Sequence, residues 1–527
     1  MPTFAAIDIG SNSCRLAIAE VVGHRLKTLH EDREITRLGE SVFEAGVISP
    51  EAMAVTVKAL KRFHKAVQMH AVDRVRVVAT SATRDARNAD AFKAWVKSAT
   101  GWTLEVISGL EEGRLIHLGV MTHEAGARGR CLLVDLGGGS CEITVSEAGR
   151  IKEMVSLPLG AVRLQQEFLR EEKPSKEDVG RLRKFIDREL TRGQRKLGKP
   201  RIDLVLATSG TAAALAEASN FYAAQGSVPK KVVKGKRMLS TTNAALGKLM
   251  QADTGSVRRL ADRLLKLTNA ERAAMPGIGA RRADIIAGGA QVYASLLERM
   301  ELPGFRYSPL GLRDGILAAM LADIDVKTSA HRTIEAERWE GVMAVCERYR
   351  VDLKRAEPER LHALQIFDGL ARVHELPQDY RLWLQAAAMM QDVGKFLNHQ
   401  GHHRHTHYII ANSEIFGVSP EQRAIVAAIA RYLGKSRPDA MDRPMRAVPV
   451  EEHGHVVRAV VLLRLAQALN QDRALSAVKM QVKVFPKRVV LELVPARGGA
   501  ELEAWSLKKE AAYFREIFRR ELFVEVV

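Results

Sequence analysis

The sequence has 527 residues, enough for three or four domains, and its hydrophobic content of 46% is ordinary for a folded globular protein. Its four cysteines are scattered and form no C-x-x-C pair, which argues against disulfides and a structural zinc and for a reducing compartment. A strand pattern begins almost at the N-terminus, which leaves no room for a signal peptide, and no long uncharged apolar run predicts a membrane span. We therefore expect a cytoplasmic protein.

The formal net charge of +18 predicts an anionic partner. Basic residues cluster in Arg181–Arg201 and in Lys230–Arg237. Nucleic acid, polyphosphate and a nucleotide could each explain this charge, and a solvated basic surface is the alternative. Aromatic residues make up 5% of the chain and do not interleave with the basic runs, so the sequence argues against a stacking platform for single-stranded nucleic acid.

The first motif is an Asp-Gly turn in a hairpin pattern over residues 4–30. It reads A-A-I-D-I-G-S-N-S-C and contributes five candidate binding residues: Asp8, Gly10, Ser11, Asn12 and Ser13. Residues 50–70 follow with apolar side chains at helical spacing. The short β-branched run Val75–Ala79 then predicts a buried strand, which ends at a Thr-Ser pair shortly before Arg84. Free backbone N–H groups at such a helix start suit anion binding.

A predicted strand over Leu104–Ile107 leads into a helix that starts near Leu110. Ser108 and Glu111 have the spacing of a capping box, in which the glutamate reaches back to the N–H of the cap. That assigns Glu111 a structural role. The adjacent Glu112 has none and is free for chemistry, although a lone helix glutamate is usually a solvated carboxylate.

The glycine-rich stretch Leu132–Thr144, L-L-V-D-L-G-G-G-S-C-E-I-T, predicts a second hairpin. The backbone N–H groups of its turn, formed by Gly137, Gly138, Gly139 and Ser140, could approach a phosphate closely. Asp135 could hold a hydrated Mg²⁺ beside those phosphates. Glu142 lies beyond the turn, on the strand face opposite to Cys141 and Ile143.

The two Asp-Gly turns share residue types at the same internal spacing, and a second pair of segments agrees. Residues 78–83, V-A-T-S-A-T, resemble residues 206–211, L-A-T-S-G-T, at nearly the same offset along the chain. We interpret this as an internal duplication that produces two α/β halves around a shared cleft. The later motif contributes Ser209, Gly210 and Thr211 to that cleft.

The rest of the chain changes character. A Gly-rich approach to a helix over 275–290 and a helix start over 308–317 close the α/β part. Long helical patterns follow after about Ala330, then a helix over 457–470, strands over 482–485 and 488–494, and a terminal amphipathic segment. Five histidines lie between His399 and His407, which invites a metal interpretation; a polar, anion-facing loop is the interpretation that we favour.

On these motifs the chain resembles the exopolyphosphatase / guanosine pentaphosphate phosphohydrolase (Ppx/GppA) family. That family belongs to the sugar kinase–heat-shock–actin (ASKHA) superfamily of duplicated ribonuclease-H-like domains. The resemblance rests on A-A-I-D-I-G-S-N-S, I-S-G-L-E-E-G-R-L-I-H-L-G-V, V-D-L-G-G-G-S-C-E, A-T-S-G-T, S-P-L-G-L-R-D-G and N-H-Q-G-H-H-R-H. It implies that Glu112 is the general base, assisted by Glu142, and that Arg84 and the glycine loop bind phosphate. It also implies a magnesium ion at Asp135, together with Asp8.

The C-terminal part resembles a domain related to the His-Asp (HD) metal phosphohydrolases. The His-Asp pair would fall at Gln391-Asp392, and the later Asp at Gln467 or Asn470, so the metal ligands are incomplete. We expect a binding and length-sensing module there, without a second active site.

The sequence thus predicts an α/β fold with two ribonuclease-H-like halves, residues 1–125 and 126–325, and a mostly helical HD-like domain, residues 326–527. The predicted function is Mg²⁺-dependent hydrolysis of terminal phosphate from polyphosphate. Alternatives are a guanosine pentaphosphate 5′-phosphohydrolase, a non-catalytic polyphosphate or nucleotide sensor, and a sugar-type kinase. We expect no nucleic-acid partner, and a homodimer stays open.

Overall fold

The computed structural model describes residues 1–124, 129–224, 250–434, 436–471, 479–494 and 499–527. These residues form two compact units, Met1–Thr333 and Ile334–Val527, and each is considered by itself. The basic cluster predicted over 230–237 lies outside the described residues. None of the helices in the described ranges is long and apolar enough to cross a membrane.

The first unit begins with a five-stranded sheet in the order β3-β2-β1-β4-β5. Its first three strands run antiparallel, and β4 and β5 continue the sheet parallel to β1. The strands are β1 (Thr3–Ile9), β2 (Ser13–Val22), β3 (Arg25–Ile35), β4 (Arg74–Ala79) and β5 (Leu104–Val106). This order is the one that the predicted ribonuclease-H-like half requires.

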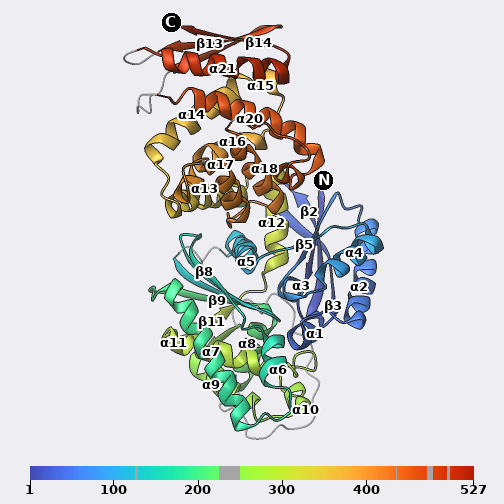
Figure 1. The fold of residues 1–527 in the computed structure, drawn as a ribbon. Coiled ribbons are helices and arrows are strands. Elements are labelled where there is room, and N and C mark those ends of the chain that lie inside the picture. Colours follow the sequence, from blue (N-terminus) through green and yellow to red (C-terminus); the bar gives the residue numbers. More distant parts are fainter. Residues whose placement is uncertain (125–128, 225–249, 435, 472–478, 495–498) are drawn as a thin grey trace. The chain divides into compact units, whose positions relative to one another are not determined.

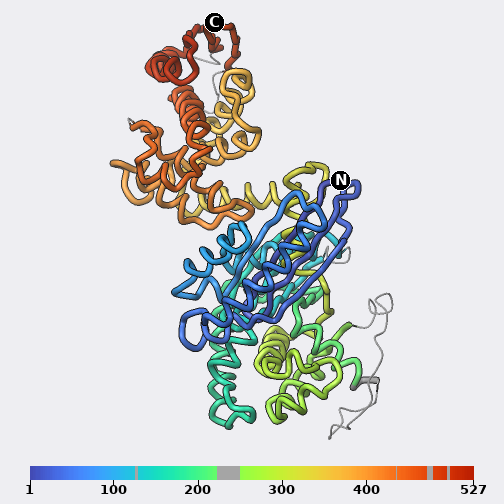
Figure 2. The backbone as a smooth tube through the Cα atoms, turned by 90° about the vertical axis from the view of Figure 1, so that its right-hand side faces the viewer, coloured from blue at the N-terminus to red at the C-terminus, as the bar shows by residue number. Residues whose placement is uncertain are grey.

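Helices cover this first sheet in the way that the sequence pattern predicted. The expected helix over 50–70 is α2 (Pro50–Met69), where Ser49 caps the N-terminus and Pro50 occupies the first position. Its apolar positions are buried. Figures 1 and 2 show α2 on one side of the sheet together with α4 (Ala89–Thr100). The short helices α1 (Leu38–Ala45) and α3 (Ser81–Asp85) lie near the ends of the strands.

The second sheet repeats this plan with one strand more, in the order β10-β11-β9-β6-β7-β8. Its strands are β6 (Arg130–Leu136), β7 (Cys141–Glu147), β8 (Arg150–Leu157), β9 (Leu204–Thr208), β10 (Gln251–Asp253) and β11 (Gly304–Tyr307). Helices of this half are α6 (Ala161–Phe168), α7 (Lys176–Leu197), α8 (Ser209–Ala224), α9 (Thr254–Leu264), α10 (Asn269–Ala273) and α11 (Ile286–Arg299). The β6-β7 hairpin corresponds to β1-β2, so the two sheets confirm the duplicated α/β fold.

Two helices, α5 (Gly109–His123) and α12 (Leu312–Ile324), pack between the sheets. α12 contacts β1 and β2 of the first sheet, and α5 contacts β7 and β8 of the second. Glycines let the two helices cross at backbone distance. A Cβ atom on Gly315 would lie 1.8 Å from the carbonyl oxygen of Leu115, and one on Gly119 would lie 2.6 Å from the nitrogen of Gly315.

The second unit is mostly helical, as predicted. Its helices are α13 (Ser329–Arg348, which begins in the first unit), α14 (Leu353–Gly369), α15 (Ala371–His374), α16 (Asp379–Met390), the 3₁₀ turns η3 (Val393–Phe396) and η4 (Val450–Glu452), α17 (His402–Asn412), α18 (Pro420–Arg431), α19 (Arg443–Arg446), α20 (His453–Ala468) and α21 (Glu501–Phe518). A three-stranded sheet of β12 (Lys479–Val484), β13 (Arg488–Val494) and β14 (Glu521–Val526) completes it.

One local prediction for this unit was wrong and another was incomplete. The histidine-rich stretch is not a loop, because four of its five histidines lie in the first turns of α17. The terminal amphipathic segment is not a single element, because α21 ends at Phe518 and the chain then forms β14, parallel to β13. The pairing of β14 joins residues far apart in sequence, which the local pattern could not show.

Candidate active site

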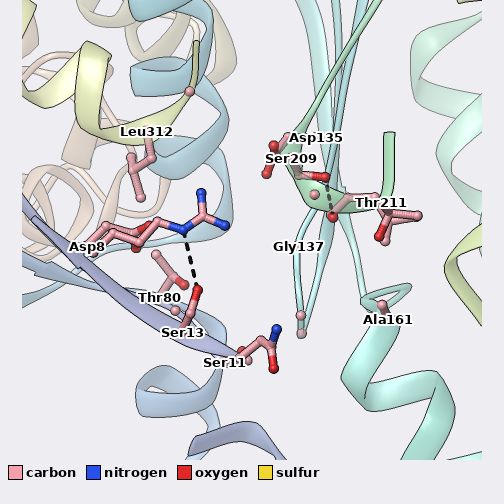
Figure 3. Close-up of a pocket in the computed structure, with 18 of the residues that line it drawn as sticks. Asp8, Ser11, Ser13, Thr80, Asp135, Gly137, Ala161, Ser209, Thr211 and Leu312 are labelled. Carbon is pink, nitrogen blue, oxygen red and sulfur yellow. Dashed lines mark hydrogen bonds between the residues drawn. The ribbon is translucent and has the colours of Figure 1, made fainter. Parts of the chain in front are cut away.

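The sequence-predicted binding residues converge on one cavity of about 270 Å³ within the first unit (Figure 3). Figure 3 shows Asp8, Ser11 and Ser13 on one side and Asp135, Gly137 and Thr211 on the other. Thirteen of the residues predicted to bind substrate or metal line this cavity: Asp8, Gly10, Ser11, Asn12, Ser13, Asp135, Gly137, Gly138, Gly139, Ser140, Ser209, Gly210 and Thr211. Glu112 lines it as well, whereas Arg84 and Glu142 are not among its lining residues.

The two Asp-Gly turns have the same backbone geometry. The N–H of Gly10 donates to the carbonyl of Ser13, and the N–H of Gly137 donates to the carbonyl of Ser140, each at 3.0 Å. The turns also approach each other: a Cβ on Gly139 would lie 2.7 Å from Ser11 Oγ, and one on Gly138 would lie 3.2 Å from the Asn12 nitrogen. Glycine is therefore required in the second turn because the two halves meet there, in addition to any contact with phosphate.

Glu112 sits in the first turn of α5, which Ser108 caps by accepting a hydrogen bond from the Glu111 N–H at 3.1 Å. Glu112 is 7% exposed, and its Oε2 atom is buried without a hydrogen-bond partner. Arg84 Nη1 lies 3.8 Å from that oxygen, and the carbonyl of Ile107 accepts a hydrogen bond from the same nitrogen at 2.7 Å. The structure thus brings Arg84 and Glu112 together as predicted.

The helix cap is only partly as predicted, because Ser108 accepts from the Glu111 N–H but the Glu111 carboxylate does not complete a capping box. The two carboxylate oxygens of Glu111 accept hydrogen bonds from the guanidinium of Arg114, both at 2.7 Å. Arg114 is buried at 3% exposure. Glu111 therefore compensates a buried cation as well as contributing its N–H to the helix cap.

Glu142 is buried beside Glu112 because α5 packs closely on β7 and β8. Glycines allow this contact: a Cβ on Gly113 would lie 3.4 Å from the Cβ of Glu142. Glu142 Oε1 accepts a hydrogen bond from Ser156 Oγ at 2.7 Å, whereas its Oε2 is buried without a partner. The side chain lies on the strand face opposite to the core residues Cys141 and Ile143, as predicted.

Burial raises the pKa of the Glu112 carboxyl well above its usual range, and the neighbouring Glu142 raises it further. Burial also raises the pKa of Glu142, with Asp135 as the next contribution. Two carboxyl groups in low-dielectric surroundings do not both ionise easily. A buried carboxylate with an unpartnered oxygen is well suited to accept a proton from water.

Asp8 and Asp135 contribute two further carboxylates, one from each half. Thr208 Oγ1 donates a hydrogen bond to Asp135, and burial raises the pKa of both aspartates. Within the described ranges there is no group of three or more ligand side chains that could hold a metal ion by themselves. Mg²⁺, however, is often bound by one or two carboxylates plus substrate phosphates and water. The pair therefore fits a Mg²⁺ shared with a phosphorylated substrate.

Four arginines line the same cavity and were not predicted as site residues: Arg15, Arg33, Arg282 and Arg313. Arg15 pairs with Asp8 across β1-β2 and with Arg33 across β2-β3. Burial and the surrounding arginines lower the pKa of Arg33 to about 10, and its Nε is buried without a hydrogen-bond partner. Spacing could have indicated Arg15, since it shares a strand face with Ser13. Arg282 and Arg33 join the site only through tertiary structure.

Comparison with known proteins identifies this arrangement. Residues 17–323 match the model of the Ppx/GppA phosphatase family, and residues 338–511 match that of Ppx/GppA phosphatase domain III. The chain belongs to the Ppx/GppA phosphatase family. Members of this family are phosphatases, and its actin-like N-terminal region and helical domain III correspond to the two units.

Several solved structures are similar to this chain. An exopolyphosphatase from Cytophaga hutchinsonii is 26% identical, with a TM-score of 0.53 over 62% of this chain and 99% of its own. An exopolyphosphatase-like protein is 27% identical, with a TM-score of 0.52 over 60% of this chain and 96% of its own. The Ppx/GppA family member from Aquifex aeolicus is 31% identical, with a TM-score of 0.48 over 61% of this chain and 97% of its own.

In domain III, the positions expected to replace metal ligands lie together. Gln391 and Asn470 are both buried, and Asn470 Nδ2 donates a hydrogen bond to the buried carboxylate of Glu359 at 3.3 Å. Burial raises the pKa of Glu359 to about 7 against the effect of both side chains, which lower this pKa and so lie beside the carboxylate. Asn470 rather than Gln467 therefore occupies the position beside Gln391.

The basic cluster over 181–201 is partly compensated. Five of its arginines lie within ion-pair distance of a carboxylate: Arg181, Arg183, Arg188, Arg192 and Arg201. Since acids of α7 and of neighbouring segments pair with these arginines, this segment contributes less free positive charge than its sequence indicated. The cavity arginines are the stronger candidates for phosphate contacts.

Proposed function

We propose that the protein is an exopolyphosphatase that hydrolyses the terminal phosphoryl group of inorganic polyphosphate. The observation that carries this proposal is the placement of Glu112, with its unpartnered oxygen, in a cavity that also contains four arginines. Phosphoryl transfer asks mainly for positioning and for neutralisation of charge. The arginines and the backbone of the two turns supply the second requirement, and Glu112 supplies the base.

In the proposed reaction, Glu112 orients a water molecule toward the terminal phosphorus. The water oxygen bonds to phosphorus, the bridging P–O bond breaks, and the water proton passes to the Glu112 carboxylate. The products are orthophosphate and a chain shorter by one phosphate. Burial and the neighbouring Glu142 keep the pKa of Glu112 high, and Arg84 lies against the same carboxylate. When bound by Asp8 and Asp135, Mg²⁺ would neutralise charge on the phosphate oxygens.

The composition of the cavity favours a chain of phosphates over a nucleotide. Among the described residues that line it, Tyr307 is the single aromatic one, against four arginines. A second candidate is guanosine pentaphosphate 5′-phosphohydrolase activity, which the apolar side of the cavity around Ile285, Tyr307 and Leu312 supports. A nucleoside placed there would leave its phosphates near the arginines.

The test is phosphate release from long-chain polyphosphate and from guanosine pentaphosphate, side by side, with and without Mg²⁺. We expect polyphosphate to be the better substrate by kcat/KM, with hydrolysis dependent on Mg²⁺. Glu112→Gln should bind substrate but turn over more slowly by a factor of about 10²–10⁴. Binding without any hydrolysis by the native chain would support a non-catalytic sensor, and a clear preference for guanosine pentaphosphate would support the second candidate.

A further inference from the structure

Domain III contains a second cavity, of about 550 Å³, that the proposed function does not use. It lies between the end of α13, the start of α14 and the turn η3. Its size is within the range of ordinary small-molecule sites. The lining residues are Tyr349, Arg350, Val351, Asp352, Lys354, Arg355, Asp392, Lys395, Phe396 and His399.

Some charged side chains of this cavity have a partner of opposite charge, and others do not. Lys395 and Arg355 lie 2.6 Å and 3.9 Å from the carboxylate of Asp392, so this acid is already neutralised. Asp352 caps the start of α14 by accepting a hydrogen bond from the Lys354 N–H. Arg350 and Lys354 are exposed, and no carboxylate of the described residues lies within ion-pair distance of them. The cavity therefore carries excess positive charge at its mouth.

One polar atom inside also lacks a partner. Arg355 Nε is buried and makes no hydrogen bond with the described residues, and Asp392 Oδ2 is 3.9 Å away. A buried guanidinium N–H without an acceptor is costly, and an anionic ligand would supply one.

Two aromatic rings line the same cavity. Tyr349 and Phe396 contact each other edge to face, with ring centroids 5.6 Å apart. Phe396 is 50% exposed although η3 begins with two buried residues, Val393 and Gly394. An exposed ring beside uncompensated cations is the combination that holds a flat base by stacking and its phosphates by charge.

We propose that this cavity of domain III binds a nucleotide, with the base on Phe396 and the phosphates on Arg350, Lys354 and Arg355. This site is independent of the catalytic cavity and of the substrate proposed there. The catalytic cavity differs from it in chemistry, because its arginines surround carboxylates and a single tyrosine, whereas here an exposed phenylalanine lies beside the cations.

A local fluorescence reporter tests the proposal in the full-length chain. Phe396→Trp places an indole at the expected stacking position, and GDP should quench its fluorescence saturably. Phe485→Trp is the matched control, since Phe485 is also an exposed aromatic of the same unit with an arginine over its ring, but lies outside the cavity. The proposal requires saturable quenching in the Phe396→Trp protein and none in the Phe485→Trp protein.

Charge variants in the same reporter background test the phosphate contacts. Arg350→Gln and Lys354→Gln should each weaken GDP binding by about three- to tenfold, whereas Lys487→Gln, an exposed lysine elsewhere, should leave it unchanged. Guanosine without phosphates should bind at least about tenfold more weakly than GDP.

The proposal is wrong if GDP does not quench Phe396→Trp beyond the Phe485→Trp control, or if the charge variants leave the affinity unchanged. Inorganic tripolyphosphate is the remaining comparison. If it displaces GDP with equal or higher affinity, the site recognises phosphate alone, and the nucleotide assignment is overturned.

Discussion

Arg84 Nη1 lies 3.8 Å from Glu112 Oε2 and is held in place by the carbonyl of Ile107. The guanidinium is close enough to favour the ionised carboxylate, and it opposes the effects of burial and of Glu142 on the pKa of Glu112. Arg84 thus sets how easily the proposed base ionises, in addition to any contact with phosphate. Arg84→Gln should therefore shift the acidic limb of the kcat/KM–pH profile to higher pH, and an unchanged limb beside a raised KM would assign Arg84 to substrate binding alone.

The raised pKa values of Glu112 and Glu142 have a consequence for stability. In the window between the ordinary glutamate pKa and the raised values, the folded state binds more protons than the unfolded state, so the free energy of unfolding falls as pH rises. The slope has an upper limit of about 1.4 kcal/mol per pH unit for each proton. Denaturant unfolding at several pH values should show this fall, and Glu142→Gln should reduce it. A Glu142→Gln protein with the native slope would contradict the assignment.

Glu111→Gln tests the structural role of the neighbouring glutamate. The variant keeps the N–H that donates to Ser108 but loses the charge that compensates buried Arg114, so we expect a loss of about 1–2 kcal/mol in unfolding free energy. Phosphate release should change little at a temperature where the variant is folded. Glu112→Gln, the matched variant at the next residue, should keep its unfolding free energy but release phosphate much more slowly. If the Glu111→Gln protein is folded but inactive, Glu111 is the base and Glu112 has the structural role.

Because α5 and α12 cross in close contact, Gly→Ala at the crossing should destabilise the protein, whereas Gly→Ala at an open helix position should stabilise it. Gly315→Ala would place a methyl group 1.8 Å from the Leu115 carbonyl, so the helices must separate at a cost of about 1–3 kcal/mol. Gly180→Ala in α7 is the control: nothing lies within 4 Å of its Cβ position, and alanine should stabilise this helix by about 0.5–1 kcal/mol. Equal effects in denaturant unfolding would show that the helix crossing is not tight.

The arginines of the catalytic cavity repel one another. Removing one of them should therefore raise the stability of the protein and weaken substrate binding. Arg33→Gln removes a buried cation whose neighbours are Arg15 and Arg282, and should raise the unfolding temperature. The same change should raise the KM for polyphosphate, because one phosphate contact is lost. Tripolyphosphate should stabilise the native protein more than the variant in a thermal shift measurement. A variant that is less stable than the native protein would mean that Arg33 is held by favourable contacts.

Features that are encoded by neighbouring residues could be predicted from the sequence, whereas features that depend on tertiary contacts could not. Both hairpin turns, the helix start at Ser108 and the pair Glu111-Glu112 are encoded within a few residues, and the structure places them as expected. Arg33 could not be predicted as a site residue, because its segment has no motif of its own, and the Gly-rich stretch over 275–290 gave no sign that Arg282 reaches the cavity. The parallel pairing of β14 with β13 was missed for the same reason, since a helix separates the two strands in sequence.

The close approach of Gly139 to Ser81 and of Gly138 to Asn12 also bears on how the duplicated halves diverged. The first turn reads Gly-Ser-Asn-Ser and the second Gly-Gly-Gly-Ser, so only one copy kept side chains at its two central positions. Both copies could not have done so, because those side chains would occupy the same space when the halves come together. The two turn sequences are therefore not interchangeable, because the side chains of Ser11 and Asn12 require glycines opposite them in the second half.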